Sequence, residues 1–171
     1  MSGIAIGVVS DTHMPRFGKA LPAALRAGLA PVDAIVHCGD IVDAMAIPLF
    51  EQIAPLEAVA GNNDPPDLHH RFGKRKILEF GAVRIGVTHG HDGVGRSTLA
   101  RAQNAFKGER VDAVLFGHSH VPYNHVHDGV LYFNPGSPTD RRRQPEYSYG
   151  IIRINGNKLL PELIFYPDKS P

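Results

Sequence analysis

The sequence lacks several features that mark secreted, membrane-bound and nucleic-acid-binding proteins. It has a single cysteine, Cys38, so it can form neither an intramolecular disulfide nor a zinc site built from cysteines. It has no apolar run near the ~20 residues that a membrane-spanning helix needs. Its formal net charge is only +1, which gives no general field to attract nucleic acid. We therefore expect no membrane partner and no general nucleic-acid binding.

The first ten residues also lack the basic region and cleavage site that a signal peptide carries. Together with the lone cysteine, this predicts a cytoplasmic protein. Of the 171 residues, 43% are apolar and 20% are charged, which is the composition of an ordinary globular protein. No repeat, linker or low-complexity segment interrupts the chain, so we expect one domain over residues 1–171.

One residue type is abundant, because the chain has ten histidines and no tryptophan. Histidine is a common metal ligand, and it is the side chain that changes charge near neutral pH. A single histidine at a strand end is more often a structural group than a ligand, so its position along the chain has to separate the two. We interpret five of the ten as structural or surface groups: His37, His69, His70, His125 and His127.

Hydrophobic spacing predicts strands and helices in alternation. We expect a strand at 4–9 and further strands within the apolar runs VDAIVHCGD, LEAVAGNND, RKILEFGAVRIGVTHGH and VDAVLFGHSH, the third of which forms two strands. Helical spacing is present at 21–29, 44–53 and 97–106. Near the C-terminus, turn signals at Asp128-Gly129 and Asn155-Gly156 predict hairpins. This order favours an α/β protein with a mixed sheet, or two stacked sheets, and helices outside.

Five of the apolar runs end in polar tips, which read SDTH, HCGD, GNND, THGH and GHSH. In open α/β sheets, functional sites form beyond the carboxyl ends of strands. Residues i and i+2 of an extended segment point to the same face. We therefore expect Asp11 and His13 to reach one ion, and His118 and His120 to project together into the same site. Carboxylate, imidazole and amide ligands suit Mn²⁺, Fe or Zn²⁺. The seven candidate ligands are Asp11, His13, Asp40, Asn62, His89, His118 and His120.

Seven protein ligands are too many for one tetrahedral ion, but they suit two ions that share a carboxylate. Without ions, two aspartates and four histidines buried together would carry a heavy desolvation cost. The metal site is therefore the favoured interpretation of the joint placement, although a tight turn would explain each tip separately.

In this order, the motifs D-x-H, G-D, G-N-x-D, H-G-H and G-H-x-H over residues 11–120 resemble those of the calcineurin-like metallophosphoesterases. The length and the motif NPGS at 134–137 are similar to the small bacterial and archaeal phosphodiesterase branch of that superfamily. The resemblance implies a four-layer α-β-β-α sandwich of two mixed sheets with helices outside and a dinuclear metal site at the C-terminal ends of the strands. It also implies how the ligands divide: Asp11, His13 and His120 hold one ion, Asn62, His89 and His118 hold the other, and Asp40 bridges both.

The resemblance further implies a metal-dependent phosphoesterase in which a hydroxide that bridges two divalent ions attacks phosphorus. Manganese is the first choice of metal, with iron, zinc and nickel as alternatives. We expect a phosphodiesterase that hydrolyses a small or nucleotide-like phosphodiester. A phosphomonoesterase or phosphoprotein phosphatase would use the same metals. A non-catalytic interaction scaffold, such as the retromer subunit of this fold, usually loses a ligand, whereas all seven positions here hold competent residues. Small members often form dimers or larger assemblies, so a homo-oligomer stays open.

One position departs from the pattern of the superfamily. Many members have a histidine as the third residue of G-N-x-D, close to the leaving group, whereas this chain has Asn63, which cannot deliver a proton at neutral pH. The sequence therefore favours substrates with a good leaving group, or an acid from elsewhere in the chain. His91 is the best candidate for that acid, provided that the segment after His89 stays extended. We expect Asp64 to orient a neighbouring group rather than bind metal, and Pro65-Pro66 to rigidify the following turn.

The segment SPTDRRRQPE (137–146) reads as an exposed irregular loop that carries three consecutive arginines, Arg141–Arg143. Guanidinium groups match phosphate oxygens in pairs, so these residues could contact a phosphodiester. Short charge runs usually face water, however, and a solvated loop is the favoured interpretation.

Overall fold

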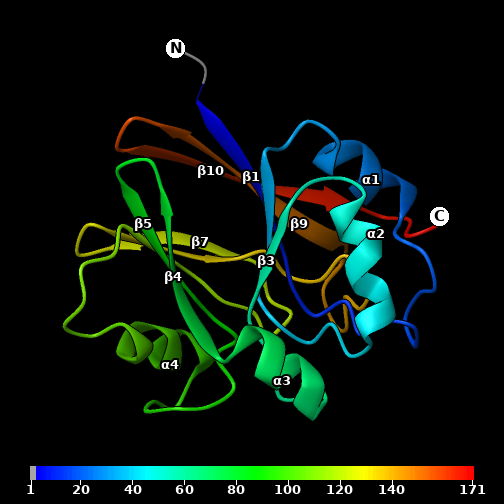
Figure 1. The fold of residues 1–171 in the computed structure, drawn as a ribbon, viewed down its shortest axis with the longest axis horizontal. Coiled ribbons are helices and arrows are strands. Elements are labelled where there is room, and N and C mark those ends of the chain that lie inside the picture. The colour runs from blue at the N-terminus through cyan, green and yellow to red at the C-terminus, as the bar shows by residue number, and fades with distance from the viewer. Residues whose placement is uncertain (1–2) are drawn as a thin grey trace.

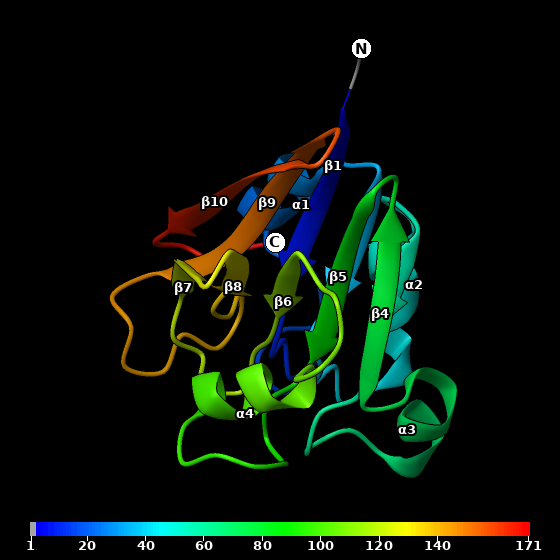
Figure 2. The same cartoon turned by 90° about the vertical axis from the view of Figure 1, so that its left-hand side faces the viewer.

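Two five-stranded sheets stack face to face in the computed structural model, which describes residues 3–171 (Figures 1 and 2). In spatial order, the first sheet contains β10 (Lys158–Tyr166), β9 (Tyr147–Asn155), β1 (Ile4–Val9), β2 (Ala34–His37) and β3 (Leu56–Ala58). The second sheet contains β4 (Arg75–Phe80), β5 (Val83–Thr88), β6 (Ala113–Leu115), β8 (Val130–Asn134) and β7 (Tyr123–His127).

Both sheets are mixed. Strands β1, β2 and β3 are parallel, while β9 and β10 are antiparallel to their neighbours. In the second sheet β5, β6 and β8 are parallel, and the outer strands β4 and β7 are antiparallel. The helices are α1 (Ala23–Leu29), α2 (Ile47–Glu51), α3 (Pro66–Phe72) and α4 (Thr98–Ala105), with a 3₁₀ turn η1 (Ala44–Ala46) before α2. This architecture confirms the expected sandwich of two mixed sheets with helices.

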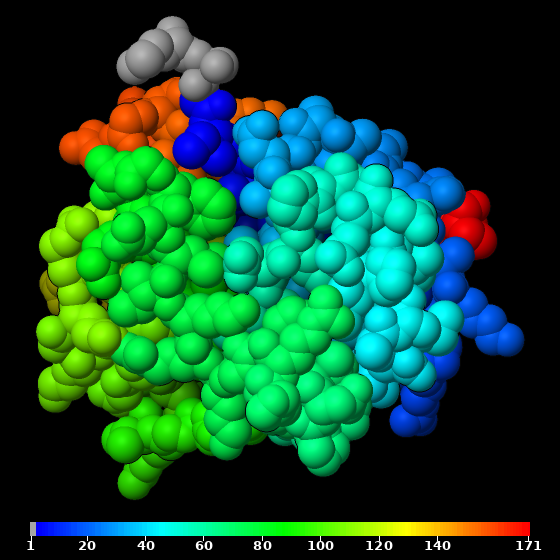
Figure 3. Space-filling view, in the orientation of Figure 1, coloured from blue at the N-terminus to red at the C-terminus, as the bar shows by residue number. Residues whose placement is uncertain are grey.

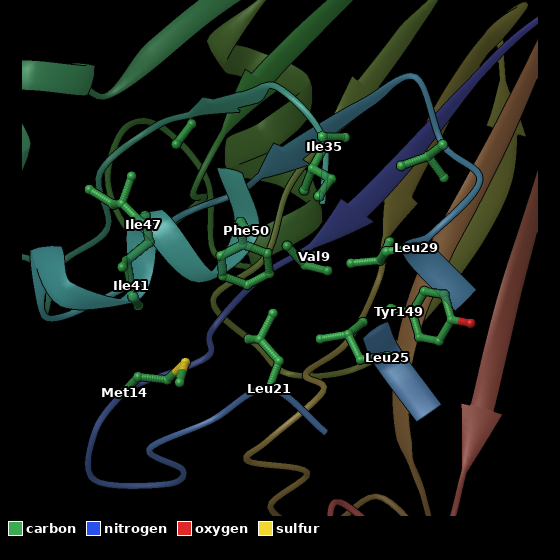
Figure 4. Close-up of a cluster of buried hydrophobic side chains, with 14 of the residues drawn as sticks. Val9, Met14, Leu21, Leu25, Leu29, Ile35, Ile41, Ile47, Phe50 and Tyr149 are labelled. Atoms are coloured by element: carbon green, nitrogen blue, oxygen red, sulfur yellow. The ribbon is translucent and has the colours of Figure 1, made fainter. Parts of the chain in front are cut away.

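Three buried clusters fill the spaces between the layers. Under α1 and α2, Leu25, Leu29 and Phe50 pack against the outer face of the first sheet (Figure 4). Between the sheets, residues such as Ile6 and Phe133 form a second cluster. A smaller cluster lies under α4, on the outer face of the second sheet. Because both faces of the central strands are covered, those strands read as nearly continuous apolar runs.

The two halves of the chain also meet along one side of the sandwich, where α2, α3 and the β4–β5 hairpin share the face seen in Figure 3. The backbone N–H of Ala60, just after β3, donates to the carbonyl of Gly73, just before β4, over 2.7 Å. This bond holds the end of the first sheet beside the start of the second.

No helix among residues 3–171 is long and apolar enough to cross a membrane.

Four of the sequence-based expectations need correction. Helix α1 begins at Ala23 because Pro22 is its N-cap. The expected helix at 44–53 is a 3₁₀ turn followed by the shorter α2, whose first turn contains Pro48. Pro66 begins α3, where its missing N–H costs nothing, rather than only stiffening a turn. The loop at 137–146 is exposed only in part, since its first three residues are buried.

Candidate metal centre

Six of the seven candidate ligands lie in loops that follow the carboxyl ends of β1, β2, β5 and β6, and the seventh, Asn62, follows β3. These four strands run in the same direction through the two sheets, so their ends meet at one edge of the sandwich, on the side where α3 and α4 lie (Figure 2). Strand β1 leads to Asp11 and His13, β2 to Asp40, β5 to His89, and β6 to His120. The fold thus brings together polar tips from both halves of the chain.

Asp11 stands at the middle of the cluster. Its Oδ1 lies 3.5 Å from His120 Nε2, 3.6 Å from His89 Nε2 and 3.8 Å from His13 Nε2. Asp40 Oδ2 lies 3.2 Å from His89 Nε2 and 3.5 Å from His13 Nε2. Two groups of three ligand atoms, each group within 4.8 Å, result: one from Asp11, His13 and His120, the other from Asp11, Asp40 and His89.

Four of these ligand atoms are buried without a hydrogen-bond partner among residues 3–171: Asp11 Oδ1, His13 Nε2, His89 Nε2 and His120 Nε2. A buried polar atom left unpaired costs on the order of 1–3 kcal/mol, and natural proteins contain few of them. Four such atoms, three of them within 3.5–3.8 Å of the fourth, Asp11 Oδ1, are not explained by packing. Divalent cations accept nitrogen and oxygen ligands of this kind and would satisfy these atoms, so the donor set fits a metal.

Two of the histidines are oriented by backbone carbonyls behind them. His89 Nδ1 donates to the carbonyl of Cys38 over 2.7 Å, and His120 Nδ1 donates to the carbonyl of Asp140 over 2.5 Å. A carbonyl can only accept, so Nδ1 carries a proton and Nε2 is the nitrogen left to bind a metal within the cluster. This is the usual support of a metal-ligating histidine.

The backbone at these tips is not extended, which corrects the reasoning from alternating faces. Asp11, His13, Asp40, His118 and His120 have φ angles of 57°, 45°, 61°, 69° and 62°. The left-handed region costs on the order of 1–2 kcal/mol for a residue with a side chain. The pairs two residues apart therefore converge through left-handed turns, and strained backbone of this kind gathers at functional sites.

Hydrogen bonds fix both carboxylates of the cluster. Asp11 Oδ2 accepts from Ser10 Oγ over 2.6 Å and from the backbone N–H of His118 over 2.9 Å. Asp40 accepts from the backbone N–H of Asn63 over 2.8 Å and from its side-chain amide over 3.0 Å. Each aspartate still has an oxygen that faces the histidines.

Comparison with known proteins agrees with this geometry. The model of the calcineurin-like phosphoesterase superfamily domain matches residues 4–157. The chain belongs to this superfamily. The family is one of metal-dependent phosphoester hydrolases, which confirms the resemblance seen in the sequence.

Two relatives illustrate the membership in the family, and one solved structure illustrates the fold. A probable metallophosphoesterase of Methanocaldococcus jannaschii is 36% identical over 134 residues, which cover 78% of this chain and 68% of the relative. A phosphodiesterase of the same organism is 31% identical over 145 residues, covering 77% and 82% of the two chains. Vacuolar protein sorting 29 from Cryptosporidium parvum shares the fold with a TM-score of 0.77 at 19% identity, covering 98% of this chain and 100% of that one.

The aspartates and His89 of the cluster strongly shift one another's pKa values. Burial opposes charge on Asp40, but the hydrogen bond and the charge of His89 outweigh it and lower the pKa of Asp40 to about 2. Burial likewise opposes protonation of His89, while Asp11 and Asp40 favour it and raise the pKa of His89 to about 9. A metal ion that binds at His89 Nε2 must therefore displace a proton.

The remaining predicted ligands lie on the open side of the cluster. His118 is partly exposed, and its ring centroid lies 5.2 Å from that of His89. Asn62 is exposed in the loop after β3. The structure therefore gathers Asp11, His13, Asp40, His89 and His120 tightly, places His118 beside His89 and leaves Asn62 exposed.

The three residues predicted around the reaction are placed differently from one another. The chain turns at Gly90, with φ 95°, so the segment from His89 to His91 is not extended as expected, yet the His91 ring lies 5.4 Å from that of His89 and 6.3 Å from that of His118. The side-chain amide of Asn63 donates a hydrogen bond to Asp40. Asp64 lies behind the cluster, where its carboxylate accepts the backbone N–H groups of Asp40, Gly61 and Val42 over 2.6–2.9 Å.

Sequence reasoning missed the residues that hold the loops together. Ser137 Oγ donates to the carbonyl of Asp11 over 2.8 Å, and Thr139 Oγ1 donates to the carbonyl of Thr12 over 2.7 Å. Asn134 Nδ2 donates to the carbonyl of Gly117 over 3.0 Å. The motif NPGS at 134–137 was the signal that could have revealed them, because it begins with Asn134 and ends with Ser137.

Proposed function

We propose that this protein is a metal-dependent phosphodiesterase that hydrolyses a small or nucleotide-like phosphodiester. The observation that carries the proposal is the gathering of four buried, unpaired ligand atoms at the strand ends, with three histidine nitrogens within 3.5–3.8 Å of Asp11 Oδ1. The name phosphodiesterase given to a relative 31% identical to this chain supports the choice of a diester substrate. The domain proposed to do this comprises residues 1–171.

The cluster would hold two divalent ions, with manganese as first choice and iron, zinc or nickel as alternatives. Asp11, His13 and His120 are the proposed ligands of one ion, and Asp40, His89, His118 and Asn62 those of the other. Asp40 is proposed to be shared, and the position of Asp11 in both groups makes it a second candidate for that role. Two such ions supply an activated water and neutralise charge on a phosphoryl group.

Two residues of the chain are proposed to assist the metal ions: Asn63 orients Asp40, and His91 donates a proton to the leaving group. Asn63 orders Asp40 through two hydrogen bonds, so it is engaged away from a leaving group. His91, at the rim, is the proposed donor to the leaving group. Burial lowers the pKa of His91, so it is mainly neutral at pH 7 and is a weak acid catalyst there. This favours substrates whose leaving group needs little protonation.

Two other functions share parts of this description. A phosphomonoesterase would use the same metals, and the assay below separates it from a diesterase. The likeness to vacuolar protein sorting 29 concerns the fold, and it raises an interaction scaffold as the second candidate. The retained cluster of unpaired ligand atoms favours catalysis over that role.

The test compares the hydrolysis of bis(p-nitrophenyl) phosphate with that of p-nitrophenyl phosphate by protein stripped of metal and then titrated with Mn²⁺. We expect metal-dependent turnover that prefers the diester, and a fall of at least about 100-fold in Asp40→Asn. Asp67→Asn, on the exposed side of α3, is the matched control and should keep the rate of the wild type. Preference for the monoester would move the assignment to a phosphatase, and no turnover with bound metal would favour the scaffold.

A further inference from the structure

A small hollow lies beside the metal cluster and is rich in arginine. It has a volume of about 220 Å³, and we call it the arginine hollow; it is lined by Ser119, His120, Val121, Arg141, Arg142, Arg143 and Gln144. We propose that the arginine hollow binds a second phosphate group of the substrate, next to the diester that is cleaved. The inference rests on the proposed phosphodiesterase function and names the chemistry of its substrate.

The position of the hollow separates it from the metal cluster. Of the tightly gathered cluster residues, only His120 lines it. A group bound there would therefore lie beside the cleaved phosphodiester and would not replace it. Pockets that enclose a whole ligand usually measure ~300–1,000 Å³, so 220 Å³ suits one part of a larger molecule.

The charge of the lining is all of one sign. Three arginines face the hollow, and none of the described residues that line it is acidic. Arg141 is committed elsewhere, since its guanidinium donates to the carbonyl of Gln144 over 2.7 Å and lies 5.6 Å from the centre of the Tyr147 ring. Arg142 and Arg143 are exposed and are the two that can meet a ligand. Guanidinium groups bind phosphate oxygens in pairs.

The loop that carries these arginines is anchored to the metal cluster. Ser137 and Thr139 donate to the backbone of the loop that contains Asp11, and the carbonyl of Asp140 accepts from His120. Two residues after that carbonyl, Arg142 has a φ of 50°, in the left-handed region. A merely solvated charge run needs neither such anchoring nor strained backbone, whereas a preorganised binding site uses both.

A structural role for Arg142 is the competing explanation. Its Nε lies 3.8 Å from Asp140 Oδ2, which in turn lies 3.8 Å from His120 Nδ1. Arg142 could thus simply balance the Asp140 carboxylate. That role would use Nε and one carboxylate, however, and would leave unexplained why Arg143 lines the same hollow.

The test uses two substrates that differ only by the second phosphate: thymidine 5′-(p-nitrophenyl phosphate) and the same ester with a 3′-phosphate. Both release p-nitrophenol from the same diester. We expect the wild type to have a kcat/KM about tenfold higher for the 3′-phosphorylated ester, mainly through KM. In Arg142→Gln/Arg143→Gln the ratio of the two kcat/KM values should fall to about one. Arg26→Gln, on the exposed face of α1, removes a like charge far from the hollow and should keep the ratio.

Binding measured by calorimetry gives a second readout that does not need turnover. Thymidine 3′,5′-bisphosphate should bind the wild type about tenfold more tightly than thymidine 5′-monophosphate, and the double variant should bind the two alike. Equal ratios in the wild type and the double variant, in either experiment, would overturn the proposal. If neither ester is hydrolysed with any metal, the phosphodiesterase function fails, while the calorimetric comparison still decides whether the arginine hollow binds phosphate.

Discussion

At the scale of the residue, one carboxylate outside the cluster shapes the loops that build it. Asp64 is 7% exposed, and its carboxylate oxygens are not among the grouped ligand atoms of the cluster. Instead it accepts three backbone N–H groups, those of Asp40, Val42 and Gly61, which belong to two different loops. We propose that these bonds hold Asp40 in its left-handed conformation, so that Asp64 acts as a positioning residue.

Replacing Asp64 with asparagine should therefore weaken both the fold and the site. One oxygen becomes an NH₂ group that faces backbone donors, so about 2–4 kcal/mol of unfolding free energy should be lost. The affinity for Mn²⁺ should fall about 10–100-fold, because Asp40 is no longer held in place. Chemical denaturation and calorimetric titration would measure the two effects. An unchanged metal affinity in a folded variant would show that Asp64 does not position Asp40.

His37 gives a prediction about pH. It is completely buried, its Nδ1 accepts from the backbone N–H of Gly39, and its Nε2 lies 3.1 Å from Thr12 Oγ1. Burial lowers the pKa of His37 to about 3, whereas an unfolded chain has about 6.5. Between these values the unfolded state binds the proton more strongly. The stability that neutral His37 contributes is thus complete above about pH 6.5 and is lost as the pH falls toward 3.

We therefore expect the difference in unfolding free energy between the metal-free wild type and His37→Gln to shrink as the pH falls. Guanidinium denaturation of both proteins at about pH 7.5 and about pH 5 would measure it. Glutamine does not titrate, and the other groups are common to both proteins, so the comparison isolates His37. An equal difference at the two pH values would mean that His37 is not held neutral.

At the scale of the element, the last residue of β10 and the segment after it form hydrogen bonds with the loops around the site. Lys169 Nζ donates to the carbonyls of Phe17 and Thr139, each over 2.8 Å. Tyr166 OH donates to the carbonyl of Pro138 over 2.6 Å. The loop that carries the arginines is consequently fixed on one side by the cluster and on the other by the end of the chain.

Lys169→Met should cost about 1–2 kcal/mol of unfolding free energy, because the apolar stem is kept and two hydrogen bonds from a charged group are lost. Lys158→Met, at the exposed start of β10, is the control and should stay within about 0.5 kcal/mol of the wild type. Thermal and chemical denaturation would compare the three proteins. A cost no larger than that of the control would mean that Lys169 does not anchor these loops.

The elements that the sequence predicted well are those whose signal is local. Strands β1 and β5 are apolar runs, and the hairpin turn at Gly81 has the positive φ that glycine adopts freely, at 63°. Helix α3 was not predicted, because only Leu68 of its seven residues is buried and its sequence therefore lacks the regular spacing of apolar residues that marks a helix. The tips around the site were predicted as extended because their left-handed backbone is imposed by contacts between distant loops, such as the hydrogen bond from His118 to Asp11.

At the scale of the whole molecule, stacking the two sheets is what assembles the site. Asp11 and Asp40 come from the first sheet, while His89 and His120 come from the second. Neither half of the chain contains a complete group of ligands. The stability of the sandwich and the occupancy of the cluster should therefore be linked.

Mn²⁺ should consequently raise the melting temperature of metal-stripped protein. At a free concentration of about 100 times the Kd, binding adds about 2.7 kcal/mol. For a chain of 171 residues this corresponds to a rise of roughly 5–10 °C. Scanning calorimetry with and without Mn²⁺ would measure the rise, and Asp11→Asn should reduce it. A rise of equal size in Asp11→Asn would place the metal elsewhere.

The most direct test of the proposed metal centre is the number of Mn²⁺ ions bound per chain, measured by calorimetric titration of chelator-stripped protein. The cluster contains two groups of ligand atoms that share Asp11, so we predict two ions. A titration that finds one ion, or none, would contradict the dinuclear centre on which the proposed reaction depends.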